Sequence, residues 1–199
     1  INNTPRQINL LKALNANIPA YAHLSMILGD DGQKLSKRHG AVSVMQYFDQ
    51  GYLPEAILNY LARLGWSHGD DEIFSMTDFC QWFDLDHITS SSAQFNTEKL
   101  DWLNSHYIKT LPLDRISSAI EPYLKKVVHT PIDQNLLIGA IDIHRERANH
   151  LTNLAKDIAY IFEVQKPNQQ DFEKHINAEV LDLIKSFQAA LIKIDWTKE

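Results

Sequence analysis

Residues 24–40 of this 199-residue chain, LSMILGDDGQKLSKRHG, carry its clearest structural signal. The stretch opens with a short apolar run at 24–28, and Gly29 and Gly32 then enclose two aspartates. A short apolar run that ends in glycines and aspartates predicts a strand followed by a tight turn. It is the best strand candidate in the chain, and the sequence on both sides of it has helical spacing instead.

Outward from this stretch, capping residues, N-terminal prolines and apolar spacing predict a chain built mainly of helices. Pro122 lies inside one of them and should bend or split it, because proline lacks the amide that a helix interior needs. The last helix carries an apolar stripe typical of a helix packed on other helices. The connections at 110–112 and 166–170 are the expected subdomain boundaries. The expected helices cover about residues 5–15, 43–50, 54–64, 75–83, 97–109, 114–127, 134–147, 149–163 and 177–194.

The composition is that of an ordinary folded protein, with 44% hydrophobic and 22% charged residues. It excludes a disordered segment, which would lack apolar residues, and a coiled coil, which would be richer in charge. Cys80 is the only cysteine, so an intrachain disulfide and a cysteine-based zinc site are excluded, and we expect a buried structural thiol. The sequence has no run of about 18 apolar residues and no signal peptide. We therefore expect a cytoplasmic protein without a membrane segment.

The net charge of −6 hides an uneven distribution along the chain. Residues 1–48 hold five basic and two acidic side chains, a net of +3, whereas residues 49–107 hold two and ten, a net of −8. The acidic total therefore does not exclude a polyanion as partner. We expect a polyanion to bind first at the basic N-terminal end, and the acidic stretch to face solvent.

Three cations and a hydroxyl follow the predicted turn at Lys34, Ser36, Lys37 and Arg38. Such a loop suits a polyphosphate, because its cations would neutralise the charge that builds up during phosphoryl or nucleotidyl transfer. The spacing of glycine and lysine is not that of a Walker loop. On these residues alone, a solvated basic turn stays open as the simpler interpretation.

Other residues that could carry chemistry lack the spacing of a catalytic or metal site. The nine histidines show no paired ligand spacing, and the acidic runs at 70–72 and 84–86 do not form a calcium loop. We therefore expect no metal site in this chain. The four tryptophans have apolar neighbours, and we interpret them as core residues rather than stacking platforms. They are Trp66, Trp82, Trp102 and Trp196.

The letters KLSKR, placed after an apolar strand and DDG, resemble the KMSKS-type signature loop of class I aminoacyl-tRNA synthetases in the form that glutamyl-tRNA synthetases carry. The resemblance extends to NNTPRQI at 2–8, KLSKRHGAVSVMQYFDQGYLPEAILNYLARLGWSHGD at 34–70 and KLDWLNSHYI at 99–108. RERANHLTNLA at 145–155 and DWT at 195–197 resemble parts of that family's anticodon-binding region. The likeness covers nearly the whole chain, densely in the first half and loosely beyond it.

The resemblance implies a role for each residue of the loop. In that family glutamate attacks the α-phosphate of ATP, and the glutamyl group of the resulting adenylate then passes to the terminal ribose of tRNA. Position by position, Lys37 takes the ATP-binding and catalytic role, and Lys34 is a supporting catalytic cation. Leu35 would anchor the loop, and Ser36 and Arg38 complete the ATP-binding motif. ATP is the expected substrate, with Mg²⁺ in the parent enzyme and no zinc site in this chain.

The resemblance also implies a mainly α fold in two parts. Residues 1–112 would be the end of a class I, Rossmann-type catalytic domain, with a short strand, the KMSKS-type loop and a helical stem-contact region. Residues 113–199 would be the first part of a helical anticodon-binding bundle, which is incomplete. A HIGH-type motif and a glutamate-binding segment are absent. We therefore expect a central and C-terminal piece of a bacterial-type glutamyl-tRNA synthetase without its N-terminal catalytic half.

The partners implied by the resemblance are tRNA(Glu), ATP and L-glutamate, of which glutamate would bind mainly to the missing half. We expect this piece to be inactive alone, because one loop does not position the substrates. We also expect it to be a monomer that does not bind a membrane. A glutaminyl-tRNA synthetase relative is disfavoured, since its anticodon region is built of β-barrels. A stand-alone helical RNA-binding module is disfavoured because it needs no polyphosphate loop.

Arg145 and Arg147 are the candidate RNA-binding residues of the second part. An arginine side chain can read the edge of a splayed base or stack on it, which is how single-stranded loops are usually recognised. Two structural alternatives remain open at this point. Glu146 could pair with its neighbours along the helix, or the helix could serve packing only.

Overall fold

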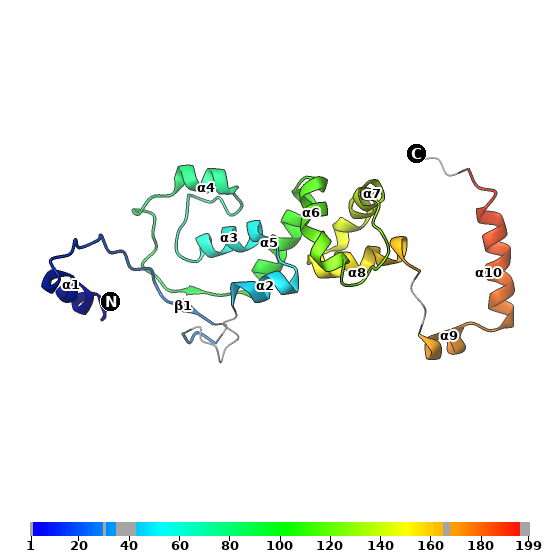
Figure 1. Cartoon of the computed structure of the whole chain (residues 1–199), viewed down its shortest axis with the longest axis horizontal. Helices are drawn as coiled ribbons and strands as arrows, with labels where there is room; N and C mark the ends of the chain where they lie inside the picture. The colour runs from blue at the N-terminus through cyan, green and yellow to red at the C-terminus, as the bar shows by residue number, and fades with distance from the viewer. Residues whose placement is uncertain (1, 30, 35–42, 165–167, 196–199) are drawn as a thin grey trace. The chain divides into compact units, whose positions relative to one another are not determined.

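The computed structural model describes residues 2–29, 31–34, 43–164 and 168–195, and it divides the chain into two compact units, Ile1–Phe162 and Glu163–Glu199. The described part is mainly helical, as predicted (Figure 1). The first unit contains α1 (Thr4–Ala13), β1 (Ile27–Leu28), α2 (Val44–Gln50), α3 (Pro54–Arg63), α4 (Met76–Trp82), β2 (Ala93–Gln94), α5 (Thr97–Thr110), α6 (Leu113–Leu124), α7 (Gln134–His144), the 3-10 helix η2 (Arg145–Arg147) and α8 (Leu151–Phe162). The second contains α9 (Gln169–His175) and α10 (Ala178–Leu191).

Local sequence signals fix the ends of α2 and α3. The Ser43 hydroxyl accepts a hydrogen bond from the amide of Met45 (3.3 Å) and caps α2. Gly51 ends that helix with a φ of +94°, a left-handed conformation that suits glycine. Pro54 occupies the first turn of α3, where its missing amide costs nothing. The starts and stops predicted from these residues are confirmed.

One continuous apolar core joins α3, α5, α6, α7 and α8. α3 packs on α5, and α6 packs on both α7 and α8. Burial of these apolar faces is the main force that holds short helices together, since isolated helices of this length are marginal in water. The largest fully buried side chains are Leu53, Leu100, Ile108, Ile116, Ile120, Leu124, Leu137, Ile141, Leu151, Leu154, Ile158 and Asn104.

Trp66 is the centre of a smaller aromatic cluster beside α4. Its ring meets Phe74 and Phe79 edge to face, at centroid distances of 5.9 and 5.1 Å. Trp66 is buried, as predicted, but Trp102 of α5 is 51% exposed, so its assignment to the core is wrong. Trp196 lies outside the described residues.

Cys80 is exposed on α4, which corrects the prediction of a buried thiol. The physical reason is the length of α4, which has only seven residues and buries none of them fully. Phe79 is the member of this helix that contacts Trp66, and its neighbour Cys80 points elsewhere.

Pro122 neither splits nor ends α6 at its own position, because it lies in the last turn, two residues before Leu124.

In the second unit, α10 begins at the predicted cap, where the Asn177 side chain accepts from the amide of Val180 (2.9 Å). The expected apolar stripe is present, and within the second unit no residue of α10 is buried. Phe187, for example, is 64% exposed. The packing of this stripe on other helices stays a prediction.

The division into compact units falls at Phe162, within a few residues of the predicted connection at 166–170. The other predicted connection, at 110–112, joins α5 to α6 inside the first unit. The division into residues 1–112 and 113–199 concerns functional parts, and it stays a prediction.

Candidate functional site

Lys34 lies at the end of a tight hairpin that starts at β1. The amide of Gly29 donates to the carbonyl of Gln33 (2.8 Å), and the amide of Gly32 donates to the carbonyl of Gly29 (2.9 Å). Gly32 has a φ of +71°, which glycine adopts without strain. Leu28 and Lys34 form an antiparallel bridge, so the exposed Lys34 side chain lies beside the end of β1. The predicted strand and turn are confirmed, although the strand has only two residues.

The segments before and after residues 35–42 are held by the same aromatic residues. β1 pairs in parallel with β2, and the amide of Phe95, just after β2, donates to the carbonyl of Leu28 (2.8 Å). The Phe95 ring lies 6.2 Å from that of Tyr47 on α2 and 5.1 Å from that of Tyr60 on α3. The strand that leads into the signature residues and the helix that follows them are thus fixed to one support.

Lys34 is the one member of the signature that belongs to the described residues. Among those residues its ammonium group has no acidic partner, so its charge is available to an anion. The other four members lie outside the described part of the chain, and their assigned roles stay predictions. They are Leu35, Ser36, Lys37 and Arg38.

The two candidate RNA-binding arginines differ in their surroundings. Arg145 is mostly buried, donates to the carbonyl of Leu111 (3.3 Å) and lies 3.4 Å from the carboxylate of Asp142. It therefore ties η2 to the end of α5 and serves the fold. Arg147 is exposed and, among the described residues, has no side-chain partner. Of the two, Arg147 keeps its guanidinium group free for a ligand.

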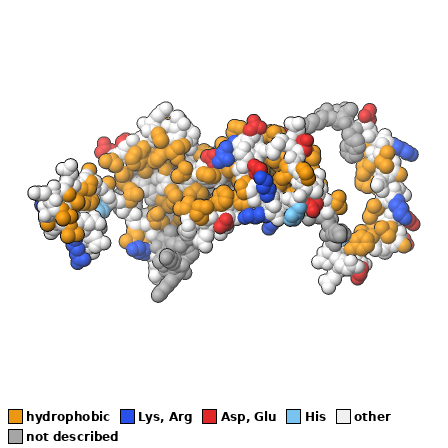
Figure 2. Space-filling view, viewed as in Figure 1, with side chains coloured by type: hydrophobic (Ala, Val, Ile, Leu, Met, Phe, Trp, Pro, Cys, Tyr) orange, Lys and Arg blue, Asp and Glu red, His pale blue; other side chains and the backbone are white. Residues whose placement is uncertain are grey.

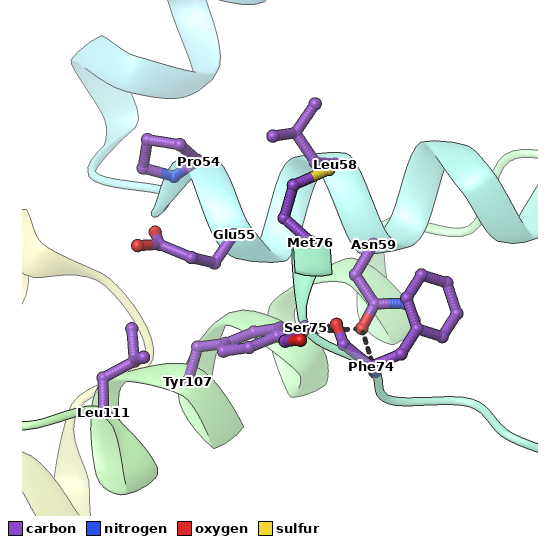
Figure 3. A pocket seen from close by; sticks show the side chains of 9 residues that line it. All are labelled: Pro54, Glu55, Leu58, Asn59, Phe74, Ser75, Met76, Tyr107 and Leu111. Atoms are coloured by element: carbon purple, nitrogen blue, oxygen red, sulfur yellow. Dashed lines mark hydrogen bonds between the residues drawn. The ribbon is translucent and has the colours of Figure 1, made fainter. Parts of the chain in front are cut away.

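A pocket of about 300 Å³ opens between α3, α5 and the start of α4 (Figure 3). Asn59 and Tyr107 lie on its wall, and the Tyr107 hydroxyl is within hydrogen-bond distance of Asn59 Oδ1 (2.8 Å) and the carbonyl of Phe74 (2.9 Å). Burial, with a smaller effect from the carboxylate of Glu55, raises the pKa of Tyr107 to about 12. Glu55 itself accepts two bonds from Arg115 (2.8 and 3.1 Å). These polar groups satisfy one another, so the arrangement is structural.

Asn104 of α5 is a fully buried polar residue that sequence reasoning missed. Its Oδ1 atom accepts from the amide of Leu53 (2.8 Å), and its Nδ2 atom donates to the carbonyl of Asn149 (2.6 Å). Nδ2 is also 3.5 Å from the carbonyl of Gly51. In sequence, an asparagine inside a helix gives no sign of whether it is buried. The turn before α3 and the segment before α8 therefore meet at a residue that no motif marks.

No three histidine, cysteine, aspartate or glutamate side chains lie together as a metal site in the part of the chain that the structure describes. Among the described helices, none is both long and apolar enough to cross a membrane.

Two protein-family models match this chain and together span it. Residues 1–102 match the catalytic domain of the family described as tRNA synthetases class I (E and Q). Residues 98–199 match a family described as anticodon binding domain. The two matches meet at residues 98–102, within α5 and somewhat before the boundary predicted at 112.

Similar curated proteins are glutamate-tRNA ligases from bacteria. The ligase of Methylobacillus flagellatus is 58% identical over 100% of this chain, which corresponds to 43% of that protein. The ligase of Thiobacillus denitrificans is 52% identical, again over 100% of this chain and 42% of its own length. The chain thus spans about two fifths of the length of the curated relatives that it matches.

Two similar solved structures are described in the same way. A glutamate tRNA ligase from Elizabethkingia meningosepticum, in complex with its amino acid, matches with a TM-score of 0.71 and 27% identity. That match covers 98% of this chain and 43% of the ligase chain. A glutamate-tRNA synthetase from Elizabethkingia anophelis matches with a TM-score of 0.67 and 26% identity, over 97% of this chain and 42% of its own.

Proposed function

Because this chain belongs to the class I tRNA synthetases for glutamate and glutamine, we propose that it is part of a glutamate-tRNA ligase. The observation that carries this proposal is the high identity, over the whole chain, to relatives named glutamate-tRNA ligase. Its part would be to supply the ATP loop and the helices that bind tRNA. Activity would require the remaining three fifths that such ligases possess.

The proposed reaction has two steps. In the first, a carboxylate oxygen of glutamate attacks the α-phosphorus of ATP, and pyrophosphate leaves as glutamyl-adenylate forms. In the second, a hydroxyl of the terminal ribose of tRNA attacks the glutamyl carbonyl, and AMP leaves. Both steps displace a phosphate that carries negative charge, so fixed cations near it lower the barrier.

Lys34 and Lys37 are the cations that we assign to the first step. The exposed position of Lys34 beside the end of β1 supports a role for it in neutralising the phosphates. Lys37 takes the ATP-binding role from its place in the signature KLSKR, in which Leu35, Ser36 and Arg38 complete the motif. The described geometry supports this assignment in one respect. β1 and α2, which flank the loop, both contact Phe95, β1 through the backbone and α2 through Tyr47.

The helices α6 to α8 are the proposed RNA-binding part of the described chain. In the view of Figure 2, lysine and arginine side chains lie in this region with aspartate and glutamate side chains among them, and residues 113–162 hold six basic and six acidic residues. Arg147 is the candidate that we retain for contact with RNA, since its guanidinium group is exposed, whereas Arg145 is held by Leu111 and Asp142. A cation that neutralises a phosphate or stacks on a base at this position would contribute affinity that falls with salt.

A glutamine-specific relative and a stand-alone RNA-binding module were the alternatives, and both are disfavoured. Residues 113–162 form helices, unlike the β-barrels expected of the glutamine-specific branch, and the curated relatives named above are ligases for glutamate. The match of residues 1–102 to a catalytic domain argues against a pure binding module. On the basis of its proposed substrates we further propose a cytoplasmic location and a monomeric state.

A chimera tests the proposed function. This chain replaces the matching 43% of the Methylobacillus flagellatus ligase, and the purified chimera is assayed for glutamylation of tRNA(Glu). We expect an active chimera, and no turnover from the 199-residue chain alone. Replacing Lys37 by alanine should slow adenylate formation by about a hundredfold or more, the usual cost of losing one transition-state charge contact.

Lys99→Ala is the matched control for Lys37→Ala. It removes one lysine of equal charge from the first unit, where Lys99 forms an exposed pair with Glu72 (2.7 Å). Pairs of this kind contribute at most about 1 kcal/mol to stability. A chimera that does not glutamylate tRNA(Glu) would refute the proposed function. An active chimera that tolerates Lys37→Ala as well as Lys99→Ala would refute the assignment of the loop.

A further inference from the structure

The corner between α2 and α3 caps the N-terminus of α8. The first amides of a helix lack partners within the helix, and here the chain supplies one from far away in sequence. The amide of Leu151 donates to the carbonyl of Gly51 (2.9 Å), and the hydroxyl of Thr152 donates to the carbonyl of Gln50 (2.8 Å). The end of α2 is therefore bonded directly to the first turn of α8.

Asn104 of α5 also bonds to both segments that meet at this contact between the corner and α8. It is 0% exposed, and its amide group bonds both to Leu53, which follows the corner, and to Asn149, which precedes α8. The approach is close as well, since a Cβ atom built on Gly51 would lie 2.6 Å from the amide nitrogen of Thr152. A buried amide that satisfies partners on two elements has little freedom, because any shift leaves polar groups unpaired.

α2 depends on this junction for its position. It has seven residues, about 10 Å of helix, and none of them is buried. Besides the corner, α2 is held by the Tyr123 hydroxyl of α6, which donates to the carbonyl of Phe48 (2.5 Å), and by its own Tyr47, whose ring packs near that of Phe95. Two of these attachments belong to α6 and α8, so the placement of α2 is coupled to that of these helices.

We infer that Asn104 is a positioning residue for the ATP step, holding α2, the helix that follows the signature residues, in register with the RNA-binding helices. This inference rests on the proposed function, because it assigns a support to the same loop. Asn104 is fully buried and does not contact a substrate. It acts through the corner at Gly51 and Leu53, so its loss should impair use of ATP more than binding of tRNA.

Asn59 provides a matched control for Asn104. It is also a buried asparagine of the first unit, 3% exposed, and its side chain accepts from the amide of Phe74 (3.2 Å) and donates to the carbonyl of Glu72 (3.0 Å). Asn104→Ala and Asn59→Ala should therefore cost similar stability. Only Asn104 bonds the corner to the segment before α8, so a difference between the variants reports on positioning rather than on folding.

The test compares the two variants in the active chimera by steady-state aminoacylation. We expect Asn104→Ala to lower kcat/KM for ATP by about tenfold or more relative to Asn59→Ala, since a misplacement of about 1 Å can cost that much. The KM for tRNA(Glu) should change equally little in both. Equal losses of kcat/KM for ATP in the two variants, or a parallel loss for tRNA, would overturn the inference.

Milder variants cover the case in which Asn104→Ala does not yield folded chimera. Thr152→Val removes one hydroxyl bond at the surface of the same junction, and Thr110→Val removes a hydroxyl that bonds within α5, to His106 (2.9 Å). The kcat/KM for ATP should fall a few-fold in Thr152→Val and stay unchanged in Thr110→Val, and equal values in the two would again overturn the inference.

A parent chimera without activity refutes the proposed function itself, whereas an active parent with indistinguishable variants refutes only the role of Asn104.

Discussion

Replacing Gly51 by alanine should destabilise this chain far more than replacing Gly69 by alanine. Both glycines have a positive φ, +94° and +51°, so both substitutions force an L-residue into left-handed backbone. They differ in their surroundings. A Cβ atom at Gly69 would meet nothing within 4 Å, whereas at Gly51 it would lie 2.6 Å from the amide nitrogen of Thr152 and 3.0 Å from that of Leu151.

The expected magnitudes follow from these distances. The left-handed backbone alone costs an L-residue about 1 kcal/mol, and this is the whole effect expected at Gly69. At Gly51 the clash is with backbone, so the corner must move away from α8. It then loses the bond that the Leu151 amide donates to Gly51 and weakens the bond that the Leu53 amide donates to Asn104. Buried groups left unpaired cost about 1 to 3 kcal/mol each, so we expect a total of about 4 kcal/mol.

Urea unfolding of the 199-residue chain measures this difference, with the fluorescence of the buried Trp66 cluster reporting on the first unit. The midpoint should shift far more for Gly51→Ala than for Gly69→Ala, at a similar slope of free energy against urea. Equal shifts would show that backbone strain alone matters at both positions. In that case the corner is not held tightly on α8, and the reasoning about this junction is wrong.

Four further outcomes are expected. Burial raises the pKa of Tyr107 to about 12, so its contribution to stability is complete below about pH 10 and is lost as pH rises toward 12. Tyr107→Phe should therefore flatten the part of the stability profile between these pH values, as measured by urea unfolding. A double-mutant cycle on Glu55 and Arg115 should give a coupling of about 1 kcal/mol, because their two-bond pair is partly buried, and a coupling near zero would contradict this. Cys80 should react with a thiol reagent in the native chain as fast as in urea, since it is exposed, and strong protection would contradict its position. Arg147→Ala should reduce the salt dependence of tRNA binding in a titration without loss of stability, whereas unchanged binding would remove Arg147 from the proposed RNA contacts.

The helices could be predicted because their ends carry local chemistry. Ser43, Gly51 and Pro54 mark the limits of α2 and α3 through a cap, a left-handed glycine and a missing amide, and each acts within a few residues. The signature around Lys34 was recognisable for a similar reason, since its glycine turn and its cations are contiguous in sequence.

Features that depend on distant partners could not be predicted. β2 has two residues and forms only because β1 pairs with it across more than 60 positions, so no periodic pattern announces it. Trp66 and Trp102 both have apolar neighbours in sequence, yet only Trp66 meets the rings of Phe74 and Phe79. Asn104 belongs to the same class, because its three partners lie 45 to 53 positions away. α9 was missed because its polar residues were interpreted as a connection.

The bond between Thr152 and Gln50 also constrains the order in which this chain can fold during synthesis. The two residues are 102 positions apart, so Gln50 at the end of α2 is synthesised about a hundred residues before its partner Thr152. At about 5 to 20 residues per second that interval lasts several seconds, far longer than a helix or a hairpin takes to form. α3 and α5 can pair in the meantime, but the corner at Gly51 stays undocked until α8 emerges. A nascent chain should therefore gain protection of α2 from proteolysis late and in one step, when its length passes the first turn of α8.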